Sequence, residues 1–429
     1  MALTTFAALT QPEKYVWARQ TMAQARNLSF IEKFVGKDAN SYIQRVTEFS
    51  KDEKGATARI GLVSDLTGAG AMGDTELWGS EEALSSSWLT IGIDQIRNGN
   101  RLAGRMTDQK AVINFRTETK DKLAYWMADM NDQMAFHHLS GIDSRLKLNG
   151  AIRTGFTYDN AGNSWSRTAG TGLALFDHGC MGAANASPAN DAAYTAMGNG
   201  IYVPSTNRGL RWVKSTKTFA ASAFASMVAE DRISYECIVN LKAYAKERYI
   251  RGVRTAGGEE EYLLIVGPRS MARLRLDSDF LANSRALQTG AGDKGQLATG
   301  AGGVLVNGVR VIESRYVFNT QGAADITAAN QDGDPGRKWG TYGNGTTTKV
   351  VVDGERCLFL GAQALAYADI GLPSWDEQPW DYDNQQGIAI SKIVGFRKPI
   401  YRTNYELNAS YTDGYAREDF GVITLDVAV

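Results

Sequence analysis

Apolar and polar residues alternate in two short runs in the first quarter of the chain. The apolar positions are Ile60 and Leu62 in ARIGLVSDL, and Leu89, Ile91 and Ile93 in SSWLTIGIDQI. Such alternation gives a strand one apolar and one polar face. Between the two runs lies the glycine-rich, acidic stretch TGAGAMGDTELWGSEEALS. The pattern predicts a two-stranded ribbon with an acidic tip. Because a lone hairpin is only marginally stable in water, its apolar face must rest on the parent domain or on another subunit.

A helical period replaces this alternation between Asp108 and Leu139. The apolar stripe at i, i+3, i+4 spacing consists of Leu123, Trp126, Met127, Met130, Met134 and His138. Thr107 can cap the N-terminus of such a helix, and Gly141 is a natural stop. We therefore predict one helix over residues 108–139, roughly 45 Å long at about 1.5 Å per residue. Its methionines and tryptophan would fill irregular gaps in a core.

The segments on either side of this helix are less regular. Residues 1–50 show helical spacing in QPEKYVWARQTMAQARN. They are either a helix packed on its own domain or an arm that packs on a neighbour. Glycine, asparagine, serine, alanine and threonine are frequent in residues 142–225, which predicts long loops with a few short elements.

Helix-like and strand-like runs alternate from about residue 229 to residue 390. DRISYECIVNLKAYAKERYI has a helical period, EYLLIVGPRS is strand-like, and RCLFLGAQALAYADIG is predicted to be a strand that runs into a helix of small residues. The alternation predicts a compact α/β unit of ordinary domain size. Two further strand-like runs, GIAISKIVGFRKPIY and DFGVITLDVAV, are expected to return and pair with earlier strands.

Charge and cysteine content narrow the class of protein. Lysine plus arginine number 46 and aspartate plus glutamate number 47, so the basic surplus typical of tight nucleic-acid binding is absent. The three cysteines, Cys180, Cys237 and Cys357, are far apart and predict no disulfide framework, which fits folding in a reducing compartment. Neither a secretory signal nor an apolar run of about 18 residues is evident, so no membrane span is expected.

The motifs of common enzymes do not occur in the sequence. No GxGxxG after a strand, GxxxxGK[ST], GxSxG or HExxH is found. His137 and His138 lie about 100° apart around a helix axis, so they fail as a zinc pair. In DHGC, the pair His178 and Cys180 has no second half of a ligand set. We therefore predict no catalytic residue, no cofactor and no metal ion.

A carboxylate cluster keeps one alternative open. The stretch SWDEQPWDYDNQQG contains Asp376, Glu377, Asp381 and Asp383. Oxygen ligands of this kind could bind a hard cation, but the regular spacing of a calcium loop is missing, and a solvated loop is the simpler interpretation. A metal-dependent soluble enzyme that uses the carboxylates near Asp381 remains an alternative.

The order of these segments resembles the major capsid proteins of tailed double-stranded DNA phages, which share the Hong Kong 97-type fold. Particular stretches are similar to the capsid family of N4-like podoviruses. They are GSEEALSSSWLTIGIDQIRNG followed by GRMTDQKAVINFR, then LAYWMADMNDQMAFHHLSG, EYLLIVGPRSMARLR, RCLFLGAQALAYAD, IVGFRKPIY and DFGVITLD. The resemblance covers most of the chain in the right order and is weakest in residues 142–225.

The resemblance implies an α+β, Hong Kong 97-like fold with five parts. They are an N-terminal arm over residues 1–50, an extension-loop β-hairpin over 51–107, a peripheral domain over 108–228 with spine helix 108–139 and loop-rich insertion 142–225, an axial domain over 229–390, and C-terminal strands over 391–429 that return to the peripheral domain. The implied function is a major capsid protein that self-assembles into the pentamers and hexamers of an icosahedral shell around double-stranded DNA. An encapsulin-like nanocompartment shell protein is a second alternative.

The same resemblance implies partners and contacts. Expected partners are other copies of the chain, a scaffolding protein, a portal protein, cement or decoration proteins, and packaged DNA contacted non-specifically, in a virion assembled in the bacterial cytoplasm; no membrane is expected. Leu123, Trp126, Met127, Met130 and Met134 would pack the spine against the peripheral sheet. We further hypothesise that the hairpin tip contacts a neighbouring subunit. The residues proposed for this contact are Glu76, Trp78, Glu81 and Glu82 on the tip, and Arg97, Arg101 and Arg105 on the neighbour. Exposed pairs of this kind contribute about 0–1 kcal/mol each, so they would set register more than affinity.

Overall fold

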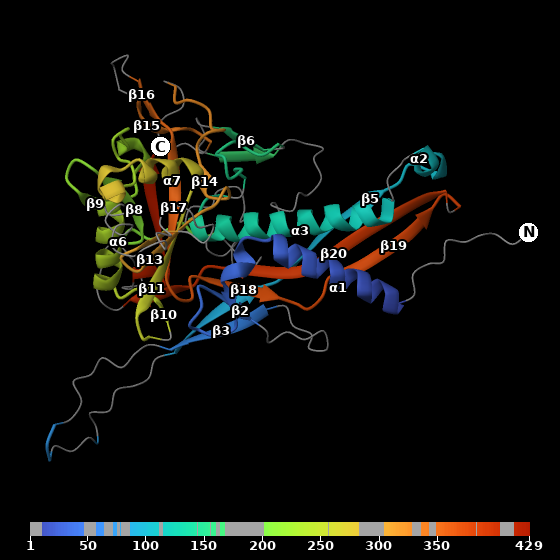
Figure 1. Cartoon of the computed structure of the whole chain (residues 1–429), viewed down its shortest axis with the longest axis horizontal. Coiled ribbons are helices and arrows are strands. Elements are labelled where there is room, and N and C mark those ends of the chain that lie inside the picture. The colour runs from blue at the N-terminus through green and yellow to red at the C-terminus, as the bar shows by residue number, and fades with distance from the viewer. Residues whose placement is uncertain are drawn as a thin grey trace, which may run out of the picture.

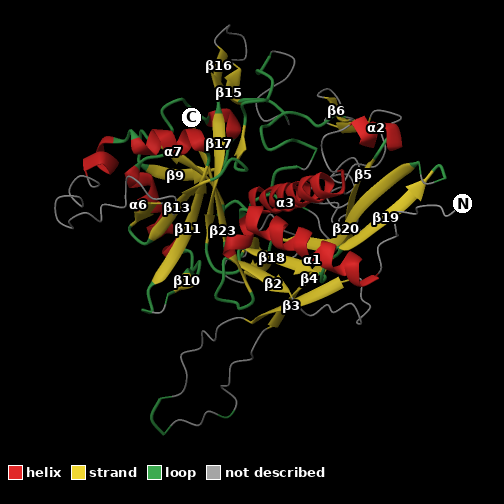
Figure 2. Cartoon of the chain, turned by 45° about the vertical axis from the view of Figure 1, so that its right-hand side comes forward, coloured by secondary structure: helices red, strands yellow, loops and turns green. Residues whose placement is uncertain are grey.

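The structure, a computed structural model, places two lobes side by side, one elongated and one compact (Figure 1). It describes residues 11–46, 57–63, 72–74, 78, 86–110, 115–143, 145–154, 156–159, 164–167, 201–255, 257–282, 304–327, 336–342, 349–382, 384–403 and 416–429. Both lobes are built on a β-sheet, and the longest helix runs from the compact lobe along the elongated one (Figures 1 and 2).

The sheet of the elongated lobe draws its six strands from both ends of the chain. Their order is β1–β2–β18–β20–β19, with β5 also paired to β20. The strands are β1 (Val35–Gly36), β2 (Ile43–Val46), β5 (Asp94–Arg101), β18 (Leu365–Asp369), β19 (Ser374–Trp380) and β20 (Gln385–Arg397). Strand β20, with 13 residues, connects most of this sheet, since it pairs antiparallel with β5, β18 and β19.

Two helices cover one face of this sheet. They are α1 (Gln11–Leu28) and α3 (Phe115–Ser140), and a core cluster with residues of α1, α3, β19 and β20 fills the space between them and the sheet. Helix α3 ends at Gly141, whose φ of 66° and N–H bond to His137 O confirm the predicted stop. A side chain at residue 141 would also collide with Pro204 and Tyr202 O.

The long helix begins later than the sequence indicated. It starts at Phe115 rather than Asp108, and Thr107 lies inside a separate short helix, α2 (Arg105–Lys110). At 26 residues α3 spans about 39 Å, not 45 Å. Residues 111–114, between the two helices, lie outside the described residues.

The compact lobe contains a nine-stranded sheet in the order β12–β13–β11–β17–β23–β8–β9, with β10 paired to β11 and β14 to β17. Its strands are β8 (Gly209–Val213), β9 (Thr218–Ala221), β10 (Val253–Arg254), β11 (Glu260–Val266), β12 (Val304–Val306), β13 (Val309–Glu313), β14 (Phe318–Asn319), β17 (Gly354–Leu360) and β23 (Val422–Ala428). Helices α6 (Tyr235–Glu247) and α7 (Pro268–Arg275) belong to this lobe. Stacked rings of Tyr262 and Phe359, 5.0 Å apart, lie in its core.

The remaining elements are short. They are the 3-10 helices η1 (Ile31–Phe34) and η2 (Phe224–Ser226), and three two-stranded sheets: β6 (Phe156–Asp159) with β7 (Ser164–Arg167), β15 (Trp339–Tyr342) with β16 (Lys349–Val352), and β21 (Ile400–Thr403) with β22 (Ala416–Asp419).

Three expectations from the sequence differ from this arrangement. The small-residue run LAYAD is not a helix but strand β18, whose five residues are all buried. The last strand, β23, does not return to the elongated lobe but lies between β17 and β8 of the compact sheet. In contrast, β18, β19 and residues 385–390 of β20, which we placed in the axial unit, belong to the elongated sheet. Strands β8 and β9, from the predicted loop-rich stretch, also join the compact sheet.

One core joins the two lobes. Its buried residues include Phe136 and Leu139 from the end of α3, Leu263 and Leu358 from the compact sheet, and Phe396 from the elongated sheet. Because burying such side chains stabilises by about 1.5–3 kcal/mol each, the lobes are expected to behave as one unit within a subunit.

Candidate assembly surfaces

A hairpin extends from the base of the elongated lobe. Strands β3 (Thr57–Val63) and β4 (Ser86–Gly92) pair antiparallel, with Ile60 opposite Leu89. The base rests on the parent sheet, where the fully buried Ile91 packs with Val46, Ala366 and Ala368. The small side chains of β18 leave room for this approach. Within the described residues, β3 pairs only with β4.

Between these strands the structure describes residues 72–74 and 78, and residues 72–74 lie away from the body of the subunit (Figure 1). Of the tip residues singled out in the sequence, Trp78 is described and is 87% exposed, and nearby Met72 is 89% exposed. Glu76, Glu81 and Glu82 lie outside the described residues. Two large apolar side chains that are nearly fully exposed in one segment are a feature of contact surfaces rather than of a solvated loop.

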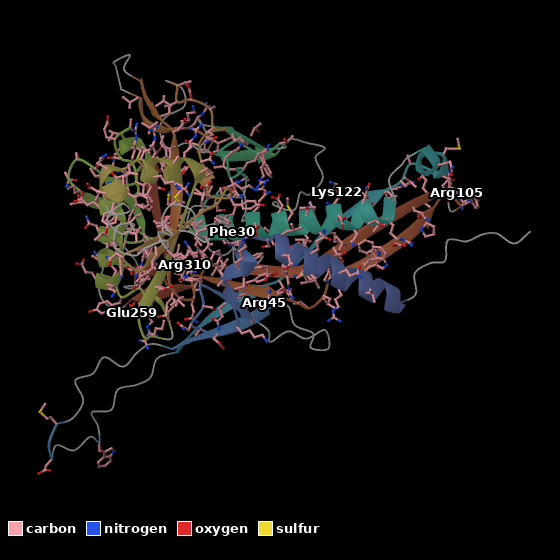
Figure 3. All side chains as sticks on the ribbon, viewed as in Figure 1. Phe30, Arg45, Arg105, Lys122, Glu259 and Arg310 are labelled. Carbon is pink, nitrogen blue, oxygen red and sulfur yellow. The ribbon has the colours of Figure 1, made fainter. Side chains whose placement is uncertain are left out.

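The three arginines proposed to receive this tip occupy two different places. Arg97 is exposed in the middle of β5, opposite Ser391. Arg101 ends the same strand, lies 5.0 Å over the Trp380 ring and donates to Gln385. Arg105 begins α2 at the far end of the lobe, as Figure 3 shows, and its backbone N–H donates to Asn384 Oδ1 at 3.3 Å. The structure thus brings Arg101 and Arg105 together and places Arg97 on the flank.

Helix α3 holds the N-terminal segment through one buried carboxylate, Asp132. Its oxygens accept from Ser29 Oγ at 2.6 Å, from Phe30 N at 2.8 Å and from Ile31 N at 3.2 Å. These are the donors at the start of η1. Burial raises the pKa of Asp132, although the three hydrogen bonds oppose the shift.

A second anchor is a group of five charges around the buried pair Lys392 and Asp369. Lys392 Nζ lies 2.9 Å from Asp369 Oδ1, and the guanidinium groups of Arg26 and Arg45 lie 3.4 and 3.6 Å from Asp369 Oδ2. Arg45 also pairs with Glu32 at 2.7 Å. Burial lowers the pKa of Lys392, and the Asp369 carboxylate opposes that shift. The group joins α1, η1, β2, β18 and β20.

These anchors hold the described part of the N-terminal segment on its own subunit. Residues 11–46 pack on their own subunit, where α1 contributes Ala18, Met22 and Ala25 to the core beside α3 and β20. Lys392 and Asp369 were not among the residues predicted from the sequence. Alternation along β20 was a usable signal, since Ile388, Ile390, Lys392, Val394 and Phe396 occupy every second position and are all buried.

The residues predicted to form the apolar stripe of the long helix differ in how far their side chains are buried. Leu123 and Met127 are buried in the cluster with Trp375, Ile388 and Ile390. Trp126 bridges two core clusters, Met134 packs against the core that joins the lobes, and Met130 is half-buried.

Both histidine side chains of α3 are buried, which disfavours their protonated form. Burial, with nearby cations as a smaller cause, lowers the pKa of His137 and of His138 to about 3. Both side chains are therefore neutral at physiological pH, and His138 stacks on Phe396 at 6.4 Å. His178 and Cys180 lie outside the described residues, whereas Cys237 and Cys357 are buried free thiols.

The acidic stretch near residue 380 is mainly strand, not a solvated loop. Asp376 and Glu377 lie in β19, and Glu377 pairs with Arg116 at 2.7 Å and accepts from Trp375 Nε1 at 3.0 Å. Asp383 lies outside the described residues. Among the residues that the structure describes, no group of three or more histidine, cysteine, aspartate or glutamate side chains could hold a metal ion. No helix in the described part of the chain is long and apolar enough to cross a membrane.

The described elements are a spine helix on a long sheet, a hairpin at the base of that lobe, an anchored N-terminal segment and a compact α/β lobe. Together they define a class of protein, the shell subunits with the Hong Kong 97-type fold. The capsid of Ralstonia phage GP4 has this fold with a TM-score of 0.63 and 22% identity, over 94% of this chain and 91% of that one. The capsid of cyanophage Pam1 matches with a TM-score of 0.60 and 16% identity, over 95% and 93% of the two chains.

Sequence comparison identifies the family. Residues 5–429 match the model of the phage capsid protein family, and the chain belongs to that family. It is also 43% identical over 426 residues to the major capsid protein of Pseudomonas phage KPP25, covering 99% of this chain and 97% of that protein. The chain is therefore a major capsid protein, a virion component that forms the icosahedral shell of a phage. Its placement among N4-like podoviruses stays a prediction.

Proposed function

We propose that the shell is built from pentamers and hexamers in which the hairpin of each subunit lies on the next subunit. The observation that carries this proposal is the hairpin itself, with a base packed on its own sheet and Met72 and Trp78 almost fully exposed beyond it. Head-to-tail contacts between identical subunits are heterologous and close into rings when the rotation allows it.

The parts of the subunit take roles in this proposal. The elongated lobe is the peripheral domain, the compact lobe is the axial domain at the ring centre, residues 51–107 are the extension loop and residues 1–50 are the N-terminal arm. Strand β23 belongs with the axial domain, and β18 to β20 with the peripheral one, because of their sheet partners.

Of the three arginines, Arg97 is the best-placed partner for the acidic tip residues Glu81 and Glu82 of a neighbour. It is exposed on the flank of the lobe, whereas Arg101 stacks on Trp380. If the pairing sets register, Glu81→Lys with Glu82→Lys will lower the yield of closed shells several-fold. Adding Arg97→Glu should restore part of that yield, as electron-microscopic particle counts would show. Normal shells from the double charge reversal would count against the pairing.

The hairpin role is tested by deleting residues 67–80. The deletion removes exposed tip residues and leaves β3, β4 and the base around Ile91 in place. We expect a folded subunit with wild-type circular dichroism and at least a tenfold lower yield of rings and shells. Shells at the wild-type yield would show that assembly does not depend on the hairpin tip.

The finer partners belong to the same proposal. A scaffolding protein, a portal protein and cement proteins are expected partners, with assembly in the host bacterial cytoplasm. The formal net charge of −1 supports only non-specific contact with the packaged double-stranded DNA. A purely structural role without catalysis fits the family. Membership of a phage capsid family favours this function over the encapsulin-like and enzyme alternatives.

A further inference from the structure

The connection from β17 to β18 carries the chain from the compact lobe into the elongated lobe (Figure 1). It contains Gln363, whose φ of 52° lies in the left-handed region that favours glycine. Gly361 N donates to Gly421 O at 2.8 Å, and a side chain at residue 361 would collide with Arg251 O. The lobes therefore meet at a close-packed crossing of the backbone.

The N-terminal segment holds this connection in place. Gln363 N donates to Ser41 O at 2.8 Å. Ala364 N donates to Tyr42 O, also at 2.8 Å. The side chain of Gln363 adds a third hydrogen bond, from its Nε2 to Gln44 Oε1 at 2.8 Å. A strained backbone conformation persists only where the surrounding structure enforces it, and the N-terminal segment supplies these bonds.

The same segment is bonded to both lobes. Asn40 Nδ2 donates to Arg254 O at 2.8 Å, and Arg254 N donates back to Asn40 Oδ1 at 2.7 Å, which ties the segment to β10 of the compact lobe. On the other side, β2 pairs in parallel with β18 of the elongated sheet, beginning with Ile43 opposite Leu365. We use the term clasp for residues 40–46.

Tyr42 adds a packing contact to the clasp. Its side chain packs against the core that joins the lobes, and its ring lies edge-on to the Phe34 ring at 6.2 Å. Burial raises the pKa of Tyr42 to about 12, and the nearby Glu261 carboxylate of the compact lobe adds to the shift. The Tyr42 side chain therefore lies where the N-terminal segment meets the compact lobe.

We propose that the clasp fixes the angle between the two lobes and thereby selects one shell size. Apolar packing in the shared core is non-directional, so it holds the lobes together but permits small rotations. Hydrogen bonds are directional, and they weaken steeply when their geometry is distorted. Because the clasp is bonded to β10, to β18 and to the connection between the lobes, a rotation of one lobe on the other distorts some of its bonds.

The effect on shell size rests on the proposed function. In that arrangement the compact lobe lies at the ring centre and the elongated lobe extends outward, so the angle between the lobes contributes to the curvature of the shell. Contacts between identical subunits close only when the rotation from one subunit to the next is defined. A fixed angle should therefore give shells of one diameter, and a loose angle should give several.

The test uses the full chain with Asn40→Ala and Gln363→Gly. The first substitution removes both bonds to β10 at an exposed site, where water can replace them. The second removes the bond to Gln44, and glycine suits the left-handed backbone. The melting temperature of the subunit should therefore stay within about 2 °C of the wild type. Lys217→Gly is the matched control, since Lys217 is exposed and has a φ of 57° outside the clasp.

Electron spin labels measure the angle between the lobes in the subunit. One label is placed on Lys122→Cys in α3 and the other on Lys246→Cys in α6, both at exposed positions. The chain also carries Cys180→Ser, and the two cysteines of the described residues are buried. We expect a narrow distance distribution for the wild-type clasp and for the control, and one at least twofold broader for the double variant. Asn40→Ala alone should give an intermediate width.

Electron microscopy of the same variants, without labels, tests the effect on the shell. We expect one shell diameter for the wild type and the control, and several diameters for the double variant. An unchanged distance distribution in the double variant and in Asn40→Ala would show that the clasp does not fix the angle. Equal broadening in the control would also contradict the proposal, and a single diameter despite broadening would show that the angle does not select shell size. Failure of the wild-type chain to form rings would instead count against the proposed function.

Discussion

Three cations converge on the carboxylate of Asp369, and one of them, Lys392, has a completely buried side chain. Taking an amine out of water is costly unless a partner compensates its charge. Asp369 supplies that partner and also draws Arg26 and Arg45 of the N-terminal segment onto the sheet. One residue therefore links the stability of the elongated lobe to the position of the segment before it.

Removing this carboxylate should be strongly destabilising. Asp369→Asn leaves Lys392 buried without its counter-charge, and we expect a loss of about 3–5 kcal/mol in the free energy of unfolding. Replacing the amine as well, with Lys392→Met in the same chain, should recover part of that loss, since Lys392 already lies against Met22. Urea denaturation of the two variants and of Lys392→Met alone gives the coupling. Additive effects would show that the pair is not coupled.

Sequence alone could reach part of this residue-level description. The alternation in GIAISKIVGF places Lys392 on the apolar face of its strand, so its burial was readable. Its partner was not, because Asp369 is 23 residues away on a strand that the sequence misassigned as a helix. Likewise, Arg97, Arg101 and Arg105 looked equivalent by spacing, and only the fold separates the middle of β5 from the far end of the elongated lobe.

Elements with long, regular patterns were the most predictable. The alternating runs form the paired strands β3 and β4, and the helical stripe forms most of α3. The prediction of a helix at β18 was wrong because a short run of alanine and leucine carries no periodicity that separates a buried strand from a helix. The prediction of the strands that pair with β23 was wrong because pairing between strands far apart in sequence leaves no local pattern.

The hydrogen bonds of Asp132 join α3 to the N-terminal segment, and their loss should affect that segment selectively. Asp132→Asn replaces one of the two accepting oxygens with an NH2 group, so the side chain can no longer accept from all three of Ser29, Phe30 and Ile31. Leaving a buried donor unsatisfied costs about 1–3 kcal/mol. We therefore expect amide hydrogens of residues 30–34 to exchange at least tenfold faster, with β17 and β23 unchanged.

A matched control lies one turn earlier in the same helix. The Asp129 carboxylate accepts from Tyr316 Oη and Gln133 Nε2 rather than from the donors of residues 29–31. Asp129→Asn should therefore leave exchange in residues 30–34 at the wild-type rate. Equal acceleration by both substitutions would mean that α3, rather than the Asp132 anchor, sets the stability of this segment.

In the whole molecule, the two lobes and residues 11–46 pack into one body, and specific surfaces remain exposed. A single core joins the two lobes, and two anchors hold residues 11–46. In contrast, the side chains of Met72, of Trp78 and of Tyr382 in the turn after β19 are almost fully exposed. This division is expected of a shell-forming protein, in which firm units meet through surfaces buried only on assembly.

Particle size measures most directly whether the chain assembles into rings and shells. We would purify the recombinant chain by gel filtration, with and without a co-expressed scaffolding protein, and image the fractions by negative-stain electron microscopy. We expect closed shells or rings of five and six subunits. A chain that elutes as a monomer or dimer under both conditions and shows neither rings nor shells would contradict it.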